Sequence, residues 1–525
     1  MSIRLLAAFG FLLVGTGPGL ADFDLTILHT NDFHSRFKPI TADGLDCPEA
    51  DDAKGACYGG AARLATAIAE ARARSDNSIL LDAGDQFSGT DFFRYYRGRL
   101  AAEMMNGFGY DAMTLGNHEF DEGAEVLGQF CELLDAPVLV SNIDVGNEPE
   151  LSGAIQSSTV IERSGERLGI VGVTLQDMHS MSQPGKNVSF DNPFRAVRAE
   201  VERLDRIGVN KIIVLSHLGY EMDKELARET YGIDVIVGGH SHILLSNRDP
   251  AASGKYPTMI GKTAIVQLYP YGKYLGSLRV TFDDEGTVTK ASGEPILLDS
   301  AIAADEATAK IIAEAEERLA DLGARAIAEA TGPIDGEQDS CRTGECALGN
   351  LVTDAMLHYA RDRGVQISVL PAAGILTSIN GGAVTFPDVR ASLRGEDRLA
   401  WLQVSGATVL EALEHGVASG EELSERFPQV SGLKFTFDPE AEPGSRVSDV
   451  MVSEGDVLVP LKRGKIYGVA TSAWVRNGGF GYDMFEDPLY HFDYGPLLSD
   501  VTADFLRDNS PYSPNPGGRI LPKAN

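Results

Sequence analysis

The chain has 525 residues, of which 43% are hydrophobic and 23% are charged, and its formal net charge is −31. These fractions are typical of globular proteins and exclude a disordered chain, and the length predicts at least two domains. Such an acidic surface repels nucleic acid and anionic membranes, so neither is an expected partner. A phosphate ester would need local positive charge, from metal ions or arginine, to bind.

The first 21 residues have the pattern of a secretory signal peptide. Arg4 precedes an apolar run that ends at Val14, and Gly19 and Ala21 place small residues before the expected cut. The apolar run is too short to span a membrane, and no cysteine follows the cut to carry a lipid. We therefore expect a periplasmic or secreted protein without a membrane anchor.

Seven apolar runs of strand length follow, with helical stretches such as residues 61–74 and 193–206 between them. The runs cover residues 25–28, 79–81, 112–115, 138–140, 168–173, 211–215 and 235–237. They are rich in Val, Ile and Leu, which suits strands buried on both faces, and the alternation predicts a layered α/β domain. Residues 274–289 are then expected to form a hairpin that turns at residues 283–286.

Residues 303–330 are expected to form a helix that connects two domains, because they are rich in Ala, Glu and Arg with apolar positions at helical spacing. Gly332 and Pro333 end this pattern. A second domain of mixed short strands and helices follows, with a helix expected over residues 347–360.

The chain has five cysteines, which suit an oxidising compartment. Cys47 and Cys57 lie close in sequence, as do Cys341 and Cys346, so we expect two short-loop disulfides. Cys131 then remains as a free thiol in an apolar stretch.

Polar residues with metal-ligating groups follow five of the predicted strands. They are Asp32 and His34 after the first run, Asp85 after the second, Asn117 and His118 after the third, His217 after residues 211–215, and His240 and His242 after residues 235–237. Ligands of open α/β sheets collect at the carboxyl ends of the strands, so we expect these side chains to meet.

Imidazole and carboxylate together favour zinc, manganese or a similar ion over magnesium or calcium. Two ions about 3.5–4 Å apart need a shared ligand, and the Asp85 carboxylate is the natural bridge. A water held between them would have its pKa lowered toward ~7 and become the nucleophile. The sequence therefore predicts a site for two divalent metal ions that hydrolyses phosphate esters.

These loops resemble those of the calcineurin-like metallophosphoesterases and, more closely, of the 5′-nucleotidase family. The matching segments are His29-Thr-Asn-Asp-Phe-His34, Gly84-Asp85, Gly116-Asn-His-Glu-Phe-Asp121, Ser216-His217, Gly238-Gly-His-Ser-His242 and residues 265–276. The resemblance continues through nearly the whole mature chain. It implies a four-layer αββα sandwich over residues 22–300, a linker helix over 301–330, and a smaller α/β substrate-binding domain over 331–522, with a hinge near 325–335.

The resemblance also implies a role for each candidate residue. Asp32, His34, Asp85 and His242 would bind one metal ion, and Asp85, Asn117, His217 and His240 would bind the other. His118 and Asp121 resemble the catalytic dyad of the family, in which an imidazolium stabilises charge on the phosphoryl group or the leaving oxygen. An alternative for Asp121 is the N-cap of a helix.

In the second domain the resemblance implies substrate contacts by Arg342 and Trp474. Phe480 is a further candidate contact, although family members commonly have an aspartate there, and other positions also depart from the family pattern. An Asn-Gly-Gly-Gly-Ile-Arg stretch is replaced by Pro371-Ala-Ala-Gly-Ile-Leu376, and Leu393-Arg-Gly-Glu396 lacks the expected stacking ring. Each ring stacked on a base contributes about 1–3 kcal/mol, so discrimination between bases is expected to be weak. Ordinary core packing is the alternative for Trp474.

A secreted phosphohydrolase of nucleoside 5′-monophosphates is thus the leading hypothesis. An enzyme with the same metals could instead act on cyclic nucleotides, nucleotide sugars or a phosphoester that is not a nucleotide. The non-enzymatic alternative is a secreted binding protein with a relic metal site, which the complete set of candidate ligands argues against. The sequence leaves the oligomeric state open.

Overall fold

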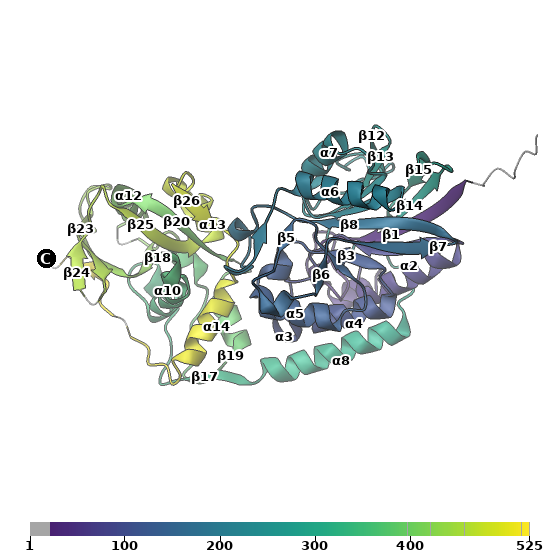
Figure 1. The fold of residues 1–525 in the computed structure, drawn as a ribbon. Coiled ribbons are helices and arrows are strands. Elements are labelled where there is room, and N and C mark those ends of the chain that lie inside the picture. The colour runs from purple at the N-terminus through teal and green to yellow at the C-terminus, as the bar shows by residue number, and fades with distance from the viewer. Residues whose placement is uncertain (1–21, 396, 421, 456, 516, 524–525) are drawn as a thin grey trace, which may run out of the picture.

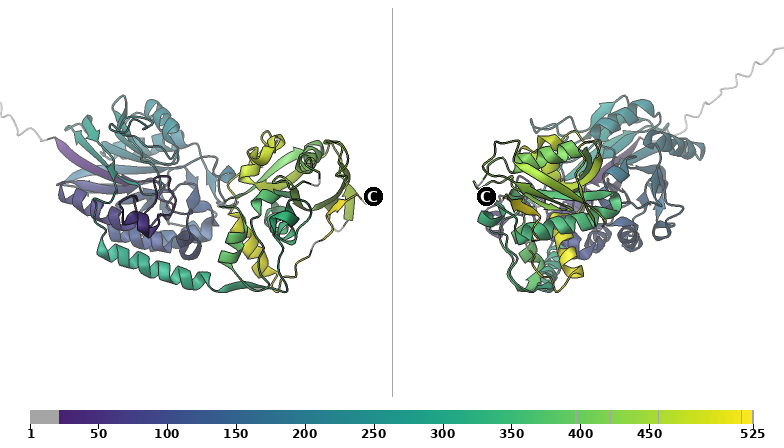
Figure 2. Two further views of the ribbon diagram at one scale, coloured as in Figure 1. Left: turned by 180° about the vertical axis from the view of Figure 1, so that it is seen from behind. Right: turned by 90° about the vertical axis from the view of Figure 1, so that its left-hand side faces the viewer.

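The computed structural model describes residues 22–395, 397–420, 422–455, 457–515 and 517–523. The predicted signal peptide, residues 1–21, and Glu396 lie outside the described residues. The chain forms two lobes joined by one long helix, α8 (Figure 1). Figure 2 shows that α8 runs along the first lobe and leads into the second.

Two sheets lie face to face in the first lobe. One has the order β15 (Val288–Gly293), β14 (Tyr274–Phe282), β1 (Phe23–Thr30), β2 (Ser78–Asp82), β3 (Ala112–Thr114), β4 (Val138–Leu139) and β6 (Ile155–Gln156), with β16 (Ile296–Leu297) beside β14. The other has the order β12 (Thr258–Ile260), β13 (Thr263–Val266), β11 (Val235–Gly238), β10 (Lys211–Ser216), β8 (Glu166–Val173) and β7 (Ser158–Arg163). All seven apolar runs form strands, as predicted, and β14 and β15 form the predicted hairpin.

Three hydrophobic clusters define the layers of this lobe. The central cluster joins the facing sheets, with Ile27 and Leu81 from one and Ile213 and Val237 from the other. A second cluster packs α2 (Ala61–Ala73), α4 (Arg99–Phe108) and α5 (Gly123–Leu133) on the outer face of the first sheet. A third packs α6 (Pro193–Arg206) and α7 (Tyr220–Glu229) on the second sheet. The expected four-layer αββα sandwich is confirmed.

The connecting helix is shorter than expected. Helix α8 covers Glu306–Gly323, and the prediction that it continues to residue 330 is wrong. Residues Ala326–Ala330 form strand β17, which pairs antiparallel with β19 (Gly382–Thr385). The helix propensity of this alanine-rich segment is worth only a few tenths of a kcal/mol per residue, so pairing with a partner strand overrides it.

The second lobe is built around a five-stranded sheet in the order β21 (Pro428–Ser431), β18 (Val365–Pro371), β25 (Ile466–Ser472), β20 (Leu399–Ser405) and β26 (Tyr490–Phe492). A smaller sheet contains β24 (Val457–Pro460), β23 (Val447–Glu454), β22 (Leu433–Phe437) and β27 (Ile520–Pro522). The α-helices are α9 (Gln338–Cys341), α10 (Ala347–Ala360), at its predicted position, α11 (Phe386–Ser392), α12 (Gly406–Gly416), α13 (Ala473–Arg476) and α14 (Leu498–Asp508). This lobe has one hydrophobic core of its own.

The cysteines pair as predicted, in disulfides Cys47–Cys57 and Cys341–Cys346. Cys131 is free, and burial raises the pKa of its thiol to about 12. Within the part of the chain that is described, no helix is long and apolar enough to cross a membrane.

Candidate metal centre

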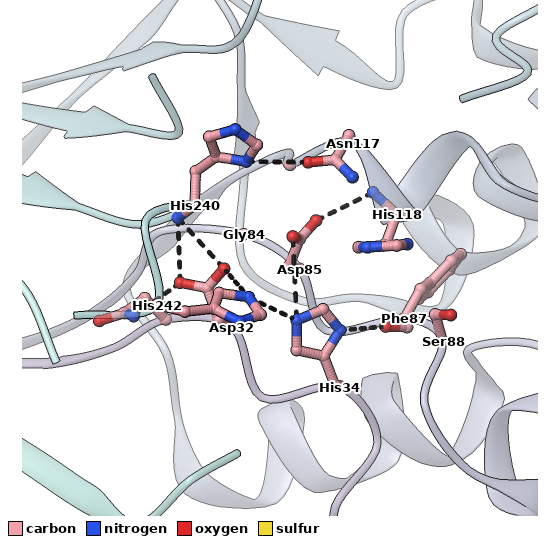
Figure 3. Close-up of polar contacts among 12 residues, drawn as sticks. Asp32, His34, Gly84, Asp85, Phe87, Ser88, Asn117, His118, His240 and His242 are labelled. Atoms are coloured by element: carbon pink, nitrogen blue, oxygen red, sulfur yellow. Dashed lines mark hydrogen bonds and ion pairs between the residues drawn. The ribbon is translucent and has the colours of Figure 1, made fainter. Parts of the chain in front are cut away.

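The candidate ligands converge where the two sheets of the first lobe meet. Strands β1, β2 and β3 run parallel in one sheet, and β10 and β11 run parallel in the other, so their carboxyl ends lie at one edge. Figure 3 shows Asp32, His34, Asp85, His240 and His242 turned toward one another across this edge. The prediction that these loops meet is confirmed in geometry.

One group of four ligand atoms comes from Asp32, His34, Asp85 and His242, all within 4.8 Å of one another. His34 Nε2 lies 3.2 Å from His242 Nε2 and 4.0 Å from Asp85 Oδ2. His242 Nε2 lies 3.3 Å from Asp32 Oδ1. Two imidazoles and two carboxylates therefore face one small space.

A second group shares Asp85 and adds His217 and His240, again within 4.8 Å. His217 Nε2 lies 3.1 Å from Asp85 Oδ2. Asn117 joins this group, because its Oδ1 lies 3.2 Å from His240 Nδ1. Asp85 is thus the carboxylate common to both groups, as a bridging ligand must be.

The electrostatics of the cluster suit a bound cation. Burial alone would raise the pKa of the Asp85 carboxyl, but His217, His118 and His34 hold it well below its ordinary value. Burial lowers the pKa of His34 to about 3 and that of His240 to about 4, which keeps these imidazoles neutral, as metal ligands must be. Two ionised carboxylates, Asp32 and Asp85, are therefore buried beside the neutral imidazoles of His34 and His240.

The environment of His217 shows whether this residue fits the role of a metal ligand. Its Nε2 is buried and lies 3.1 Å from Asp85 Oδ2 without the geometry of a hydrogen bond, while its Nδ1 lies 2.6 Å from the Ala83 carbonyl. Against the effect of burial, the neighbouring Asp85 and Asp32 raise the pKa of His217 to about 10. A ring with one nitrogen fixed by a carbonyl and the other aimed at carboxylates matches the usual environment of a metal-bound histidine.

Five candidate ligands have a left-handed backbone, which is uncommon for residues other than glycine. Their φ angles are 51° at Asp32, 52° at His34, 59° at Asp85, 73° at His240 and 53° at His242. Such strain costs about 1–3 kcal/mol per residue and persists where the surrounding structure enforces it. The loops are thus held in conformations that aim the side chains inward.

The sequence predicted a dyad of His118 and Asp121, and the structure brings the two together. His118 Nδ1 lies 2.7 Å from Asp121 Oδ2, and the His118 backbone N–H donates to Asp85 Oδ1 at 2.9 Å. Burial would lower the pKa of His118, but Asp121 and Asp85 raise it above its ordinary value. The alternative that Asp121 caps a helix is wrong, because α5 begins at Gly123 with Glu122 at its N-cap.

Glu119 was not predicted from the sequence as a site residue. It lies between His118 and Asp121 in the sequence, and its side chain is buried. Its carboxylate accepts hydrogen bonds from the backbone N–H groups of Asp85, Gln86, Phe87 and Gly116, at 2.7–3.2 Å. In the sequence, Glu119 is marked only by its position among candidate site residues. Nothing in the local pattern distinguishes this buried glutamate from a glutamate that is exposed to solvent.

Tyr271 was also missed. Its ring centroid lies 5.6 Å from that of His34 and 5.8 Å from that of His242. The Tyr271 backbone N–H donates to the Asp32 carbonyl at 2.8 Å. The residue lies in the 265–276 stretch, where the sequence indicated a family resemblance but no contact with the metal loops.

The three predicted substrate residues lie apart from this cluster, in the second lobe. Trp474 is 58% exposed, so the alternative that it packs in the core is wrong. Phe480 is half-buried, and the Arg394 guanidinium lies 5.4 Å from its ring centroid. Arg342 pairs with Glu425 at 3.4 Å. Within the described residues, no hydrogen bond or ion pair joins these three to the metal loops.

Comparisons with known proteins agree with this geometry. The family model for calcineurin-like phosphoesterases matches residues 25–244, and the model for the 5′-nucleotidase C-terminal domain matches residues 326–487. A curated 5′-nucleotidase of Diplobatis ommata is 37% identical, over 95% of this chain and 90% of that protein. The human 5′-nucleotidase is 35% identical, over 98% and 93%.

Solved structures are also similar. A 5′-nucleotidase precursor from Thermus thermophilus is 36% identical, over 96% of this chain and 100% of that chain, with a TM-score of 0.60. An NAD nucleotidase from Haemophilus influenzae shares the fold, at 24% identity over 96% and 100% with a TM-score of 0.80.

Fold, ligand cluster and family matches together define a metal-dependent hydrolase of phosphoric esters with a calcineurin-like catalytic domain. The second domain and the full-length similarity narrow this class further. The chain belongs to the 5′-nucleotidase family.

Proposed function

We propose that this enzyme hydrolyses nucleoside 5′-monophosphates or closely related phosphomonoesters, using two divalent metal ions. The observation that carries the proposal is the meeting of two ligand groups at the Asp85 carboxylate. Relatives of 34–37% identity over nearly the whole chain are named 5′-nucleotidases, which supports a nucleotide substrate.

The proposed ligands of one ion are Asp32, His34, Asp85 and His242, and those of the other are Asp85, Asn117, His217 and His240. Imidazole combined with carboxylate favours zinc or manganese. When bound, such ions polarise phosphoryl oxygens and lower the pKa of the attacking water.

The dyad of His118 and Asp121 would supply positive charge in addition to that of the metal ions. His118, protonated and held by Asp121, would donate to the phosphoryl group or to the leaving oxygen as negative charge develops there. Asp121 Oδ2 contacts Nδ1 of His118, so this ring nitrogen would donate its proton to the Asp121 carboxylate. The other nitrogen is then free to donate to substrate.

We propose that the second domain, residues 331–522, binds the rest of the substrate through Arg342, Trp474 and Phe480, and that residues 325–335 form the hinge. The exposed Trp474 ring is available for stacking. Leu376 is 40% exposed where the family pattern has arginine. This loss of a cation and of a second ring favours broad selectivity, so nucleotide sugars, cyclic nucleotides and aryl phosphates are secondary candidate substrates.

Export of the protein is part of the proposal. Residues 1–21 would be removed as a signal peptide, and the two disulfides suit a periplasmic or secreted product.

A substrate panel tests the function. Purified protein loaded with Mn²⁺ or Zn²⁺ is assayed with AMP, UMP, p-nitrophenyl phosphate, cyclic AMP and UDP-glucose. We expect release of phosphate from the monoesters, loss of activity with a chelator, and restoration by the metal. No hydrolysis of any monoester by the metal-loaded protein would contradict the proposal.

Replacement of His118 by alanine tests the dyad. The variant should keep both metal ions, because His118 is not a proposed ligand, and turnover should fall by about 10²–10³-fold. His179→Ala is the matched control, since His179 Nε2 contacts the Val188 carbonyl and no described hydrogen bond joins it to a proposed ligand or to the dyad. A His118→Ala enzyme that loses metal would show that His118 is a ligand.

A further inference from the structure

One arginine of the second domain reaches the catalytic dyad of the first. Arg398 Nη2 donates to Ser88 Oγ at 2.8 Å, and Arg398 Nη1 lies 3.9 Å from Asp121 Oδ2. This is the carboxylate oxygen that His118 contacts at 2.7 Å. A cation from one domain therefore lies beside the dyad of the other.

The position of Arg398 is fixed by its own backbone and side chain. The Arg398 carbonyl accepts from the Ala473 N–H at 2.8 Å, and residue 398 forms a bridge with Leu497. Arg398 Nη1 also donates to the Gly495 carbonyl at 3.2 Å. Only 24% of the Arg398 side chain is exposed. These contacts hold the guanidinium beside the dyad.

Besides Arg398, three described residues form hydrogen bonds with Asp121. Ser182 Oγ donates to Asp121 Oδ1 at 2.9 Å, His118 occupies Oδ2, and Gln183 Nε2 donates to the Asp121 carbonyl at 3.3 Å. Among these, Arg398 is the permanent cation, because an arginine does not titrate in proteins.

Two other arginines at this interface, Arg390 and Arg94, have close acidic partners. Arg390 pairs with Asp91 across the domains at 2.7 Å, and Arg94 pairs with Asp500. Both line a cavity of about 310 Å³ between the domains, and Asp121 and Arg398 lie on the wall of the same cavity. Arg390 and Arg94 thus join the domains, whereas Arg398 contacts the dyad.

We propose that Arg398 is a positioning residue that couples docking of the second domain to the geometry of the dyad. In the docked arrangement the guanidinium holds Asp121, and through it the His118 ring, in the orientation that stabilises the reacting phosphoryl group. With the second domain displaced, Asp121 loses this cation and the dyad loses its fixed orientation. This inference rests on the proposed function.

The test is a double-mutant cycle on the full-length, manganese-loaded enzyme with a nucleoside monophosphate. Arg398→Ala should lower kcat about 10–100-fold, the usual range for a residue that orients a functional group, with KM changed less than about threefold. In an Asp121→Asn background the same change should cost less than about threefold, because the residue it orients is already altered. Guanidinium added to Arg398→Ala should restore part of kcat, but should not do so for Asp121→Asn.

Arg390→Ala is the matched control. It breaks an ion pair between the same two domains without touching the dyad, so kcat should fall less than about threefold. Equal losses from Arg398→Ala in both backgrounds, or the same loss from Arg390→Ala, would overturn the inference. Melting temperatures separate these outcomes from misfolding, and Arg398→Lys serves where the alanine variant is unstable. A wild-type enzyme without phosphohydrolase activity would contradict the proposed function instead.

Discussion

Replacement of Glu119 by glutamine tests whether this buried carboxylate builds the metal centre. One carboxylate oxygen accepts from the Gln86 and Phe87 N–H groups, and the other accepts from those of Asp85 and Gly116. Glutamine keeps one oxygen but presents an NH₂ group to the other pair of donors. Two buried N–H groups then lose their acceptor.

The magnitude follows from these bonds. Each buried N–H left without a partner costs about 1–3 kcal/mol, so the change should destabilise the first domain by about 2–6 kcal/mol. For a domain of this size that corresponds to a fall in Tm of about 5–20 °C. Glu119→Ala would strand all four groups, at a cost comparable to the whole stability of a domain, so glutamine is the informative variant.

Metal affinity should fall as well, because the Glu119 bonds hold the backbone that carries Asp85. Loss of such a supporting group typically weakens metal binding about 10–100-fold. Thermal unfolding of the metal-free protein and calorimetric titration with Mn²⁺ measure the two effects. Glu122→Gln is the control: it lies on the same segment, but its partner is Arg97 at 3.2 Å on the surface. A Glu119→Gln protein that unfolds and binds metal like this control would refute the reasoning.

Three further substitutions test separate parts of the structure. Asp85→Ala should lose both metal ions and all turnover, and elemental analysis showing full occupancy would count against the shared ligand. Trp474→Ala should raise KM about 5–100-fold with little change in Tm, because the ring is 58% exposed; a large fall in Tm with unchanged KM would mean that the ring is structural. Burial raises the pKa of Asp234 to about 7, above its unfolded value of about 4. The protonated form is therefore favoured by folding, and this stabilisation is lost as pH rises through 7. Asp234→Asn, which keeps an acceptor for the Ile212 N–H, should raise Tm by several degrees at pH 8 but not at pH 4, and equal shifts at both pH values would argue against titration.

The strands and the residues at their ends could be predicted because their signals are local. Buried parallel strands are continuous runs of Val, Ile and Leu, and the polar residue after each run lies at the carboxyl edge of the sheet. Asp32, Asp85 and His217 were placed in this way. The end of α8 could not be placed, because residues 326–330 favour helix alone and form a strand only beside β19.

The remainder of the site depends on contacts between distant segments. The left-handed backbone of His34 and His240 is imposed by the loops around them, and no residue type in the sequence indicates it. The burial of Glu119 requires two loops to fold over it. The approach of Arg398 to Asp121 requires the second domain to dock, which is a relation between residues 277 positions apart (398 minus 121).

The reaction is easier to infer from the sequence than the substrate, because a metal centre tolerates fewer substitutions than a substrate pocket. The proposed metal centre uses seven side chains from loops after five strands, and the loss of the proposed shared ligand Asp85 would remove both proposed ions at once. The substrate pocket tolerates change, because a missing ring or arginine weakens binding by a few kcal/mol and leaves the reaction possible. In the proposed match to the family pattern, Leu376 and Gly395 occupy such positions, whereas every proposed metal position retains a ligating group. Selectivity therefore has to be tested with variants of the second domain in the full-length enzyme. Assays of Trp474→Ala with a panel of phosphomonoesters do this without disturbing the metal centre.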